Sequence, residues 1–285
     1  MRFIKLESRV PIRIIFKFGA NRIKLSKSSS EARCPMKIQL IRNATMKLTY
    51  ADRTILTDPM LSPKDAIKSF AGRSRNPTVD LPFEISEVIG DVELVIVSHN
   101  HPDHIDAVAA EELPKQMPLL CQLGDKAALA AMGFINVVPV ESKHMWQEIN
   151  IIKTGGRHGQ GKILKHMGQV SGFVFQADNE PTVYWVSDSI LCKDVESSIL
   201  DHKPDIIITH SGGATIPGYD PIIMDAKQTL ALFDKISEDV VVVAIHMEAL
   251  DHCMVSRPAL QELARAKGVA ETRLLIPQDG EIITF

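Results

Sequence analysis

Apolar and polar residues alternate in three short runs near the start of the chain: Lys37–Arg42, Thr45–Tyr50 and Arg53–Asp58. A period of two is that of a β-strand with one buried face. The breaks between the runs, Asn43-Ala44 and Ala51-Asp52, favour tight turns. We therefore expect the domain to open with an antiparallel sheet of successive hairpins.

Farther along, continuous apolar runs replace the alternation, as in strands that are buried on both faces. They predict strands at Glu93–Ser98, Val170–Gln176, Thr182–Ser187, Asp205–His210, Val240–His246 and Arg273–Pro277. The pattern between them predicts helices at His104–Leu113, Asp125–Met132, Ile222–Ile236 and Arg257–Lys267. Strands that alternate with helices indicate an α/β fold.

Residues 1–35 differ from the rest of the chain in charge, with nine Arg and Lys residues against Glu7 and Glu31. Their longest apolar run, Ile14–Phe16, is too short for a secretory signal. An organellar transit peptide and translated upstream sequence both fit, and we favour the second because a convincing strand begins at Met36. We expect a basic N-terminal extension over 1–35 and one domain over 36–285.

Composition narrows the classes of partner and location. The chain has 285 residues, 45% apolar and 24% charged, and no apolar run of about 18 residues that would cross a membrane. Its four cysteines are not paired in C-x-x-C spacing, which favours a reducing, cytoplasmic location over a disulfide framework. The net charge is −3 overall and about −10 without the extension, which argues against a nucleic-acid partner.

The densest group of chemically active residues is the HNHPDH segment at residues 99–104, directly after an apolar run. Alternating residues in an extended turn can aim His99 and His101 at one point, while Asp103 and His104 aim at a neighbouring point. Three histidines and an aspartate within six residues therefore predict a site for two metal ions.

Further candidate ligands stand near the ends of other runs. His158 lies in a glycine-rich loop, Asp188 and His246 follow apolar runs, and Asp58 ends the third hairpin strand. Loops at strand ends are held by a rigid sheet and face solvent, so α/β folds gather functional groups there. We expect these side chains to meet segment 99–104.

This order of ligands resembles that of the metallo-β-lactamase superfamily, which has an H-x-H-x-D-H segment followed by a histidine, an aspartate and a final histidine. The resemblance covers about residues 37–285. It implies an αββα four-layer sandwich of two mixed β-sheets flanked by helices. The hairpins and Thr57-Asp58-Pro59 are most similar to the branch that contains ascorbate-6-phosphate lactonase. That branch usually has Gly and Thr beside the bridging aspartate, where this chain has Ser187 and Ser189.

The resemblance also assigns roles to the candidate ligands. It implies two divalent metal ions, one held by His99, His101 and His158, the other by Asp103, His104 and His246, with Asp188 as the bridge. Asp58 is expected beside a ligating histidine, where a carboxylate orients the ring, and a plain turn residue is the alternative. Histidine-rich ligation favours Zn²⁺, and the branch also allows Mn²⁺.

Two further histidines, His210 and His252, are expected in loops that border the pocket. Either could contact the substrate or donate a proton, and a buried structural role is the alternative. We count Asp103, Asp188 and His210 as candidate catalytic residues, and place His252 next to the metal ligands.

The predicted reaction is metal-dependent hydrolysis of a small-molecule ester, lactone or phosphodiester, with hydroxide generated at the metal ions and Asp103 or Asp188 handling the proton. An iron-dependent oxidoreductase or dioxygenase of the same fold is the main alternative. His101 argues against the diiron oxidoreductases, because these relatives carry a carboxylate there, whereas mononuclear iron dioxygenases keep the histidine. A metal-binding sensor without catalysis is a third reading, but such modules lose ligands and this chain lacks none. A small-molecule substrate is the expected partner, and the resemblance allows a homo-oligomer.

Overall fold

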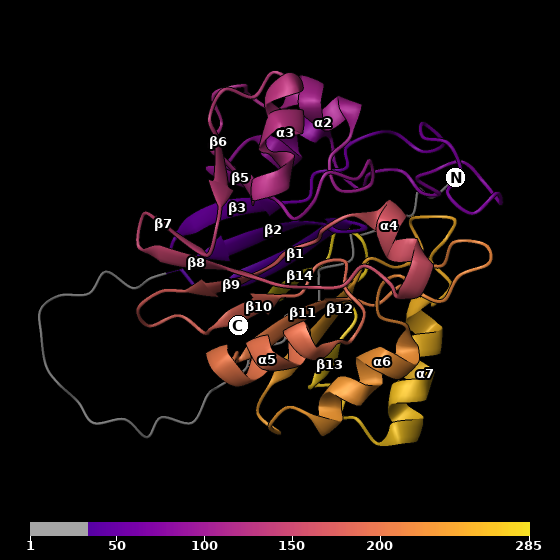
Figure 1. Cartoon of the computed structure of the whole chain (residues 1–285). Helices are drawn as coiled ribbons and strands as arrows, with labels where there is room; N and C mark the ends of the chain where they lie inside the picture. Colours follow the sequence, from indigo (N-terminus) through magenta and orange to yellow (C-terminus); the bar gives the residue numbers. More distant parts are fainter. Residues whose placement is uncertain (1–33) are drawn as a thin grey trace, which may run out of the picture.

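Two β-sheets of seven strands each lie face to face in the computed structural model, which describes residues 34–285 (Figure 1). The first sheet has the order β14-β1-β2-β3-β4-β5-β6. Its strands are β1 (Lys37–Arg42), β2 (Thr45–Tyr50), β3 (Arg53–Thr57), β4 (Leu94–Val97), β5 (Leu119–Gln122), β6 (Val137–Val140) and β14 (Ile282–Thr284). The predicted basic extension lies outside the described residues, apart from its last two.

The second sheet has the order β13-β12-β11-β10-β9-β8-β7. Its strands are β7 (Lys143–Trp146), β8 (Ile149–Thr154), β9 (Gly172–Gln176), β10 (Val183–Trp185), β11 (Ile206–His210), β12 (Val241–Ile245) and β13 (Leu274–Leu275). Both sheets are mixed. Neighbouring strands are antiparallel along β14-β1-β2-β3 and along β7-β8-β9-β10. They are parallel along β3-β4-β5-β6 and along β10-β11-β12-β13.

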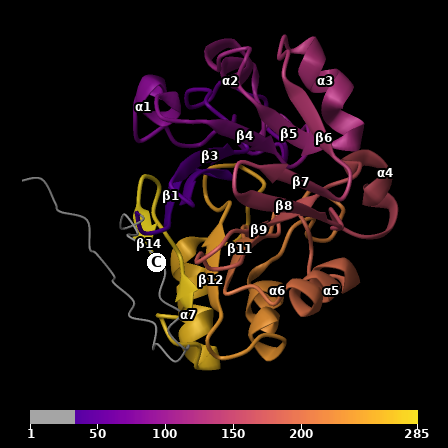
Figure 2. The same cartoon turned by 90° about the vertical axis from the view of Figure 1, so that its left-hand side faces the viewer.

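Helices cover the outer face of each sheet, as Figure 2 shows. Above the first sheet lie α1 (Ile85–Ile89), α2 (Ala107–Glu112) and α3 (Lys126–Ala131), and below the second lie α5 (Lys193–His202), α6 (Ala226–Ala231) and α7 (Arg257–Lys267). The short helix α4 (Leu164–Met167) lies to one side, and 3-10 turns occupy Leu123–Asp125, Gly161–Ile163 and Leu232–Asp234. Within residues 34–285, no helix has the length and apolar character needed to cross a membrane.

The largest apolar core fills the space between the sheets. It joins side chains of the first sheet, such as Leu48 and Ile96, to side chains of the second, such as Trp185 and Val243, all fully buried. Separate clusters pack the helices on the outer faces. The predicted four-layer metallo-β-lactamase fold is therefore confirmed.

Several predicted boundaries need correction. The helix expected from His104 begins at Ala107, because the Asp106 carboxylate caps it by accepting from the Ala109 amide. The helix expected from Ile222 likewise begins only after Asp225, which caps α6. We did not predict α1, α4, α5, β5 to β8 or β14, which are short or carry mixed burial patterns that periodicity does not resolve.

Candidate metal centre

The carboxyl ends of five parallel strands meet at one edge of the paired sheets. Asp58 follows β3, segment 99–104 begins two residues after β4, and Asp188 stands three residues after β10. His210 is the last residue of β11 and His246 follows β12. Strands β4, β11 and β12 are runs of buried, mainly β-branched residues, so the sheets fix the backbone from which these candidate ligands project.

Three residues at these strand ends have a left-handed backbone. The φ angles are 41° at Asp58, 62° at Ser187 and 60° at His246. A residue with a Cβ atom loses roughly 1–2 kcal/mol in this conformation, and such strain persists only where the surrounding structure enforces it. The chain therefore turns sharply at the points where it presents candidate ligands.

The first group of candidate ligands consists of His99, His101 and His158, whose ligand atoms lie within 4.8 Å of one another. His99 Nε2 lies 3.0 Å from His101 Nδ1. The ring centre of His158 lies 5.3 Å from that of His99 and 5.2 Å from that of His101. The loop after β8 thus brings His158 to segment 99–104, as expected from the sequence.

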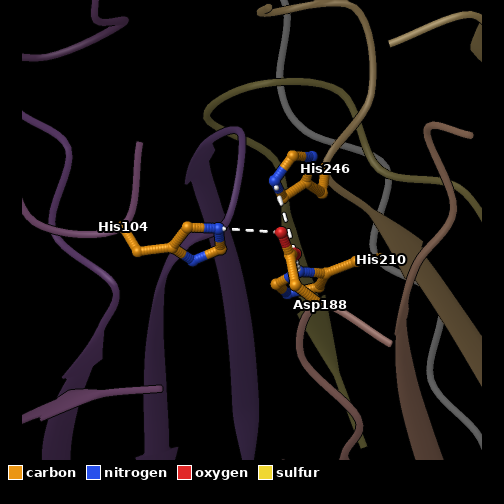
Figure 3. Close-up of side chains that lie close together, drawn as sticks. All are labelled: His104, Asp188, His210 and His246. Carbon is orange, nitrogen blue, oxygen red and sulfur yellow. Dashed lines mark hydrogen bonds and ion pairs between the residues drawn. The ribbon is translucent and has the colours of Figure 1, made fainter. Parts of the chain in front are cut away.

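The second group consists of His104, Asp188, His210 and His246, which point toward one another from four different loops and strand ends (Figure 3). Asp188 Oδ2 lies 3.2 Å from His104 Nε2, and Asp188 Oδ1 lies 3.5 Å from His246 Nε2. Asp103, which we expected here, stands at the margin of the group. Its Oδ2 lies 3.5 Å from the Nε2 atoms of both His104 and His246.

Asp188 joins the two groups. Besides its contacts in the second group, its Oδ2 lies 3.5 Å from His158 Nε2 and 3.9 Å from His99 Nε2. Its side chain is almost fully buried. One carboxylate therefore faces imidazoles of both groups, which is the arrangement expected of a bridging ligand.

A chain of hydrogen bonds behind the groups orients two of the rings. The Asp58 carboxylate accepts from the Ser98 amide and hydroxyl, both at 2.7 Å, and its Oδ2 lies 2.7 Å from His104 Nδ1. Because Ser98 Oγ donates to Asp58, it accepts from His99 Nδ1 at 3.0 Å. Both imidazoles then carry a proton on Nδ1 and direct Nε2 at the site.

Two other rings have partners of a different kind. His158 Nδ1 donates to the Ile222 carbonyl at 2.9 Å, and His246 Nδ1 lies 3.6 Å from Cys253 Sγ. In each case the partner again occupies Nδ1 and Nε2 faces the site. Outer hydrogen bonds of this kind fix the tautomer and orientation of metal-ligating histidines.

The donor set fits divalent metal ions. His246 Nε2 is buried and makes no hydrogen bond, although it points into the group. Burial lowers the pKa of His99 and of His158, which keeps these rings neutral. Burial alone would raise the pKa of Asp103 and Asp188, but the neighbouring imidazoles hold both well below the usual range. Burial alone would lower the pKa of His104 and of His246, but Asp188 beside them raises both well above the usual range, so a metal ion would replace a proton on these two rings. Deprotonated imidazoles and ionised carboxylates are ligands that Zn²⁺ and Mn²⁺ accept.

His210 lies behind Asp188 and does not line the pocket where we expected it. Trp185 Nε1 donates to His210 Nε2 at 3.0 Å, and an indole nitrogen can only donate. The proton of the imidazole is therefore on Nδ1, which donates to Asp188 Oδ1 at 2.5 Å. Burial lowers the pKa of His210 to about 4, so the ring is neutral near pH 7. With both nitrogens engaged, His210 can reach a substrate only through Asp188.

A pocket of about 350 Å³ opens over the two groups. Its lining includes ligand candidates of both groups and the apolar side chains Phe70, Met167, Ile216 and Ile222, and no Lys or Arg of residues 34–285 belongs to it. An apolar enclosure of this kind favours an uncharged organic group near the candidate metal ligands.

His252 also lines this pocket, as the sequence suggested. Its ring packs edge-on against Phe70, with ring centres 5.1 Å apart and planes at 76°. Burial lowers its pKa to about 4, and its Nδ1 has no hydrogen-bond partner among residues 34–285. The ring is therefore a neutral, largely apolar part of the pocket wall near pH 7.

Sequence reasoning missed three supporting groups: Ser98, Trp185 and Cys253. Ser98 directly precedes His99, and a hydroxyl beside a predicted ligand was a usable signal. Trp185 and Cys253 gave none, because a tryptophan in a buried strand and a lone cysteine suit a core equally well. Only the packing of β10 against β11, and of the loop after His246, reveals their partners.

Known proteins match this chain over most of its length. Residues 53–247, which include every candidate ligand above, match the family model of the beta-lactamase superfamily domain. UPF0173 protein YddR from Bacillus subtilis (strain 168) is 35% identical over 256 residues, which cover 88% of this chain and 100% of that protein.

Two solved structures are similar in fold and in length. A possible metal-dependent hydrolase from Veillonella parvula DSM 2008 has a TM-score of 0.85 and 34% identity, with 88% of this chain and 100% of that chain covered. The isothiocyanate hydrolase from Delia radicum gut bacteria has a TM-score of 0.83 and 35% identity, with 88% and 99% covered. Both cover nearly the whole range that the structure describes.

Proposed function

Because this chain belongs to the metallo-β-lactamase superfamily, and within it to the UPF0173 family of metal-dependent hydrolases, we propose that it hydrolyses a small, uncharged substrate with an apolar organic group. Isothiocyanates are the first class to test. The observation that carries this proposal is the pocket, which places apolar walls and no Lys or Arg over the metal-ligand groups. An anionic substrate would lose its hydration there without gaining a Lys or Arg side chain as a partner, and it would face the carboxylates of Asp103 and Asp188.

The residues that would hold the two metal ions are those whose free nitrogens and oxygens converge: His99, His101 and His158 for one, Asp103, His104 and His246 for the other, and Asp188 between them. Metal ions so held lower the pKa of water toward neutrality and polarise the substrate. Asp58 and Ser98 keep two of these rings in the required tautomer.

Two carboxylates are available for proton transfer. Asp103 and Asp188 both line the pocket, and both are ionised because the surrounding imidazoles lower their pKa. Either can accept a proton from the attacking water and pass it to the leaving group. His210 donates a hydrogen bond to Oδ1 of Asp188, which fixes the orientation of the carboxylate and therefore the direction in which Oδ2 points.

Isothiocyanates fit this pocket for chemical reasons. One solved relative, 35% identical, is an isothiocyanate hydrolase. An isothiocyanate is neutral and linear, with an electrophilic central carbon and an organic group that apolar walls can hold. Water adds to that carbon to give a thiocarbamate, and cleavage of the C–N bond then releases an amine and carbonyl sulfide. Both protons of the water end on the amine nitrogen.

Esters and lactones are the second candidate class, because they too are neutral and offer an electrophilic carbon to the same pocket. Phosphodiesters fit less well, since no Arg or Lys of the lining can pair with the phosphate. Membership of the ascorbate-6-phosphate lactonase branch stays a prediction. His101 continues to favour hydrolysis over the diiron alternative, and metal quantification distinguishes it from a mononuclear iron dioxygenase.

The test combines metal quantification on the purified full-length protein with a substrate panel. The panel contains allyl and phenethyl isothiocyanate, γ-butyrolactone, p-nitrophenyl acetate and bis(p-nitrophenyl) phosphate. We expect about two divalent ions per chain, amine release from the isothiocyanates, and loss of both after chelation.

A matched pair of variants controls this test. Asp188→Asn should abolish turnover, whereas Asp205→Asn should keep it, because Asp205 is exposed and its carboxylate accepts from the Thr182 amide, away from the site. Iron with oxygen-dependent turnover would overturn the proposal, and so would turnover of phosphodiesters alone.

A further inference from the structure

One carboxylate holds the loop of residues 69–76 over the pocket. Asp251 stands five residues after His246, and its side chain faces that loop. It accepts from one hydroxyl, one side-chain amide and four backbone amides, the amides at 2.9–3.4 Å: Ser69 Oγ, Asn76 Nδ2, and the N–H groups of Phe70, Ala71, Arg73 and Ser74. A side chain so surrounded by donors has a specific structural task.

Asp251 and Asn76 bind each other in both directions, because the Asp251 amide also donates to Asn76 Oδ1 at 2.8 Å. Asn76 is fully buried and Asp251 is 7% exposed. No strand or helix lies between β3 and α1. The loop closes on itself through an isolated bridge between Ile67 and Asn76 and through hydrogen bonds from the Arg75 side chain to the Asp65 and Ala66 carbonyls. The carboxylate is therefore the main tie of residues 69–74 to the rest of the molecule.

The loop carries Phe70 onto the pocket, where its ring meets His252. His252 directly follows Asp251, and its carbonyl accepts from the Thr215 amide at 2.9 Å, next to Ile216. The Asp251 and His252 pair thus places both Phe70 and Ile216, which we call the outer wall of the pocket. Both wall residues face the same space as the candidate metal ligands.

We propose that Asp251 is a positioning residue that sets the substrate selectivity of the metal centre by holding Phe70 in the outer wall. The class it selects is an uncharged electrophile whose apolar group is larger than methyl. This inference rests on the proposed hydrolase function. Asp251 itself does not line the pocket, so it acts through the loop and not by touching the substrate.

The wall favours larger apolar groups because they can reach the Phe70 ring, whereas a methyl group bound at the metal centre cannot fill a pocket of about 350 Å³. Each apolar contact of this kind changes discrimination by about tenfold. Loss of the anchor should therefore lower the preference for aromatic over methyl substrates, with little change for methyl substrates themselves.

The first experiment measures the anchor without turnover. Hydrogen exchange on the metal-loaded protein should show the amides of residues 70–73 exchanging at least about tenfold faster in Asp251→Ala than in the wild type. Asp205→Ala, which removes a different carboxylate that accepts a backbone amide, should leave this segment unchanged. Asp251→Asn, with the same shape, gives a second variant if the alanine form does not fold. If the amides of residues 70–73 exchange at the wild-type rate in these variants, Asp251 does not anchor the loop.

The second experiment measures selectivity as binding. Acetohydroxamate and benzohydroxamate bind metal ions alike and differ in the group presented to the wall. Titration calorimetry should show that Phe70→Ala and Asp251→Ala each reduce the preference for benzohydroxamate by about five- to tenfold, and that the double variant loses no more than either single one. Metal content should stay constant.

Additive effects in the double variant, or an unchanged preference in either single one, overturn the inference. The same comparison repeated as kcat/KM for phenethyl and methyl isothiocyanate links it to the reaction. If no panel substrate is turned over, the proposed function fails, while hydrogen exchange and hydroxamate binding still decide the role of Asp251.

Discussion

The metal-ligand groups and the outer wall lie side by side but are built in different ways. The ligand candidates project from the ends of parallel strands that belong to two fully formed sheets. Phe70 belongs to a loop without secondary structure, held by Asp251 at a separation of 181 residues along the chain. The sheets therefore hold the candidate metal ligands in rigid positions, whereas the shape of the pocket depends on one long-range contact.

This difference predicts two kinds of variant. A change among the strand-end groups should remove metal ions and abolish turnover of every substrate. A change in the wall should alter which substrate is preferred and leave the metal content intact. Proteins commonly place rigid reactive groups on a sheet and specificity on loops, and this chain allows the separation to be measured residue by residue.

The largest effect is expected for Asp188→Asn. Because Asp188 faces imidazoles of both groups, its loss should reduce occupancy at both metal positions and lower kcat/KM on the order of 10³-fold for every substrate. Asp103→Asn is the comparison, since the Asp103 carboxylate faces His104 and His246 of the second group and its change should spare the first position. Metal quantification checks both, and equal losses in the two variants would contradict the bridging assignment.

A smaller loss is expected for Asp58→Asn, which keeps the shape of the side chain and removes its charge. The change weakens the bond to His104 Nδ1, so metal affinity should fall by about 10–100-fold with no change in substrate preference. Asp106→Asn is the matched control, because Asp106 is also a buried carboxylate but caps α2 and accepts from the Ser62 amide. A chelator titration that gives both variants the same metal affinity would remove Asp58 from the site.

The two regions also differ in what the sequence reveals. Segment 99–104, Asp188 and His246 could be located because strand ends and ligand types are both readable from short stretches. The exact start of α2 could not, because Asp106 caps the helix only where the Ser62 loop packs against it. Asp251 gave no signal at all. Its donors lie at residues 69–76, and no short-range pattern connects two loops so far apart in the chain.

A change in selectivity is expected for Ile216→Ala. Ile216 belongs to the outer wall, and its apolar side chain is not a metal ligand, so the metal content and kcat should be retained. KM for an aromatic isothiocyanate should rise about tenfold, since apolar contact is lost. Leu200→Ala, at a side chain that is 70% exposed on α5, should change neither value. Loss of metal from the Ile216 variant would show that wall and ligand groups are not separable.

The smallest effect, and one of opposite sign, is expected for Ser187→Gly. Ser187 has a φ of 62°, and its buried hydroxyl has no hydrogen-bond partner. Glycine adopts this backbone without strain and leaves no buried polar atom, which outweighs its larger entropy in the unfolded chain. The free energy of unfolding should rise by about 1 kcal/mol, or roughly 2–4 °C in Tm.

Ser189→Gly tests this explanation two residues away. Ser189 Oγ accepts from the Arg157 amide at 2.9 Å and donates to the Ile190 carbonyl at 2.8 Å, so its loss should lower stability. If Ser187→Gly is more stable and fully active, the strained backbone before Asp188 only reflects the sharp turn of the chain. If it is more stable but slower at constant metal content, the serine contributes to the placement of Asp188, and the rigidity of the metal-ligand groups depends on more than the sheets.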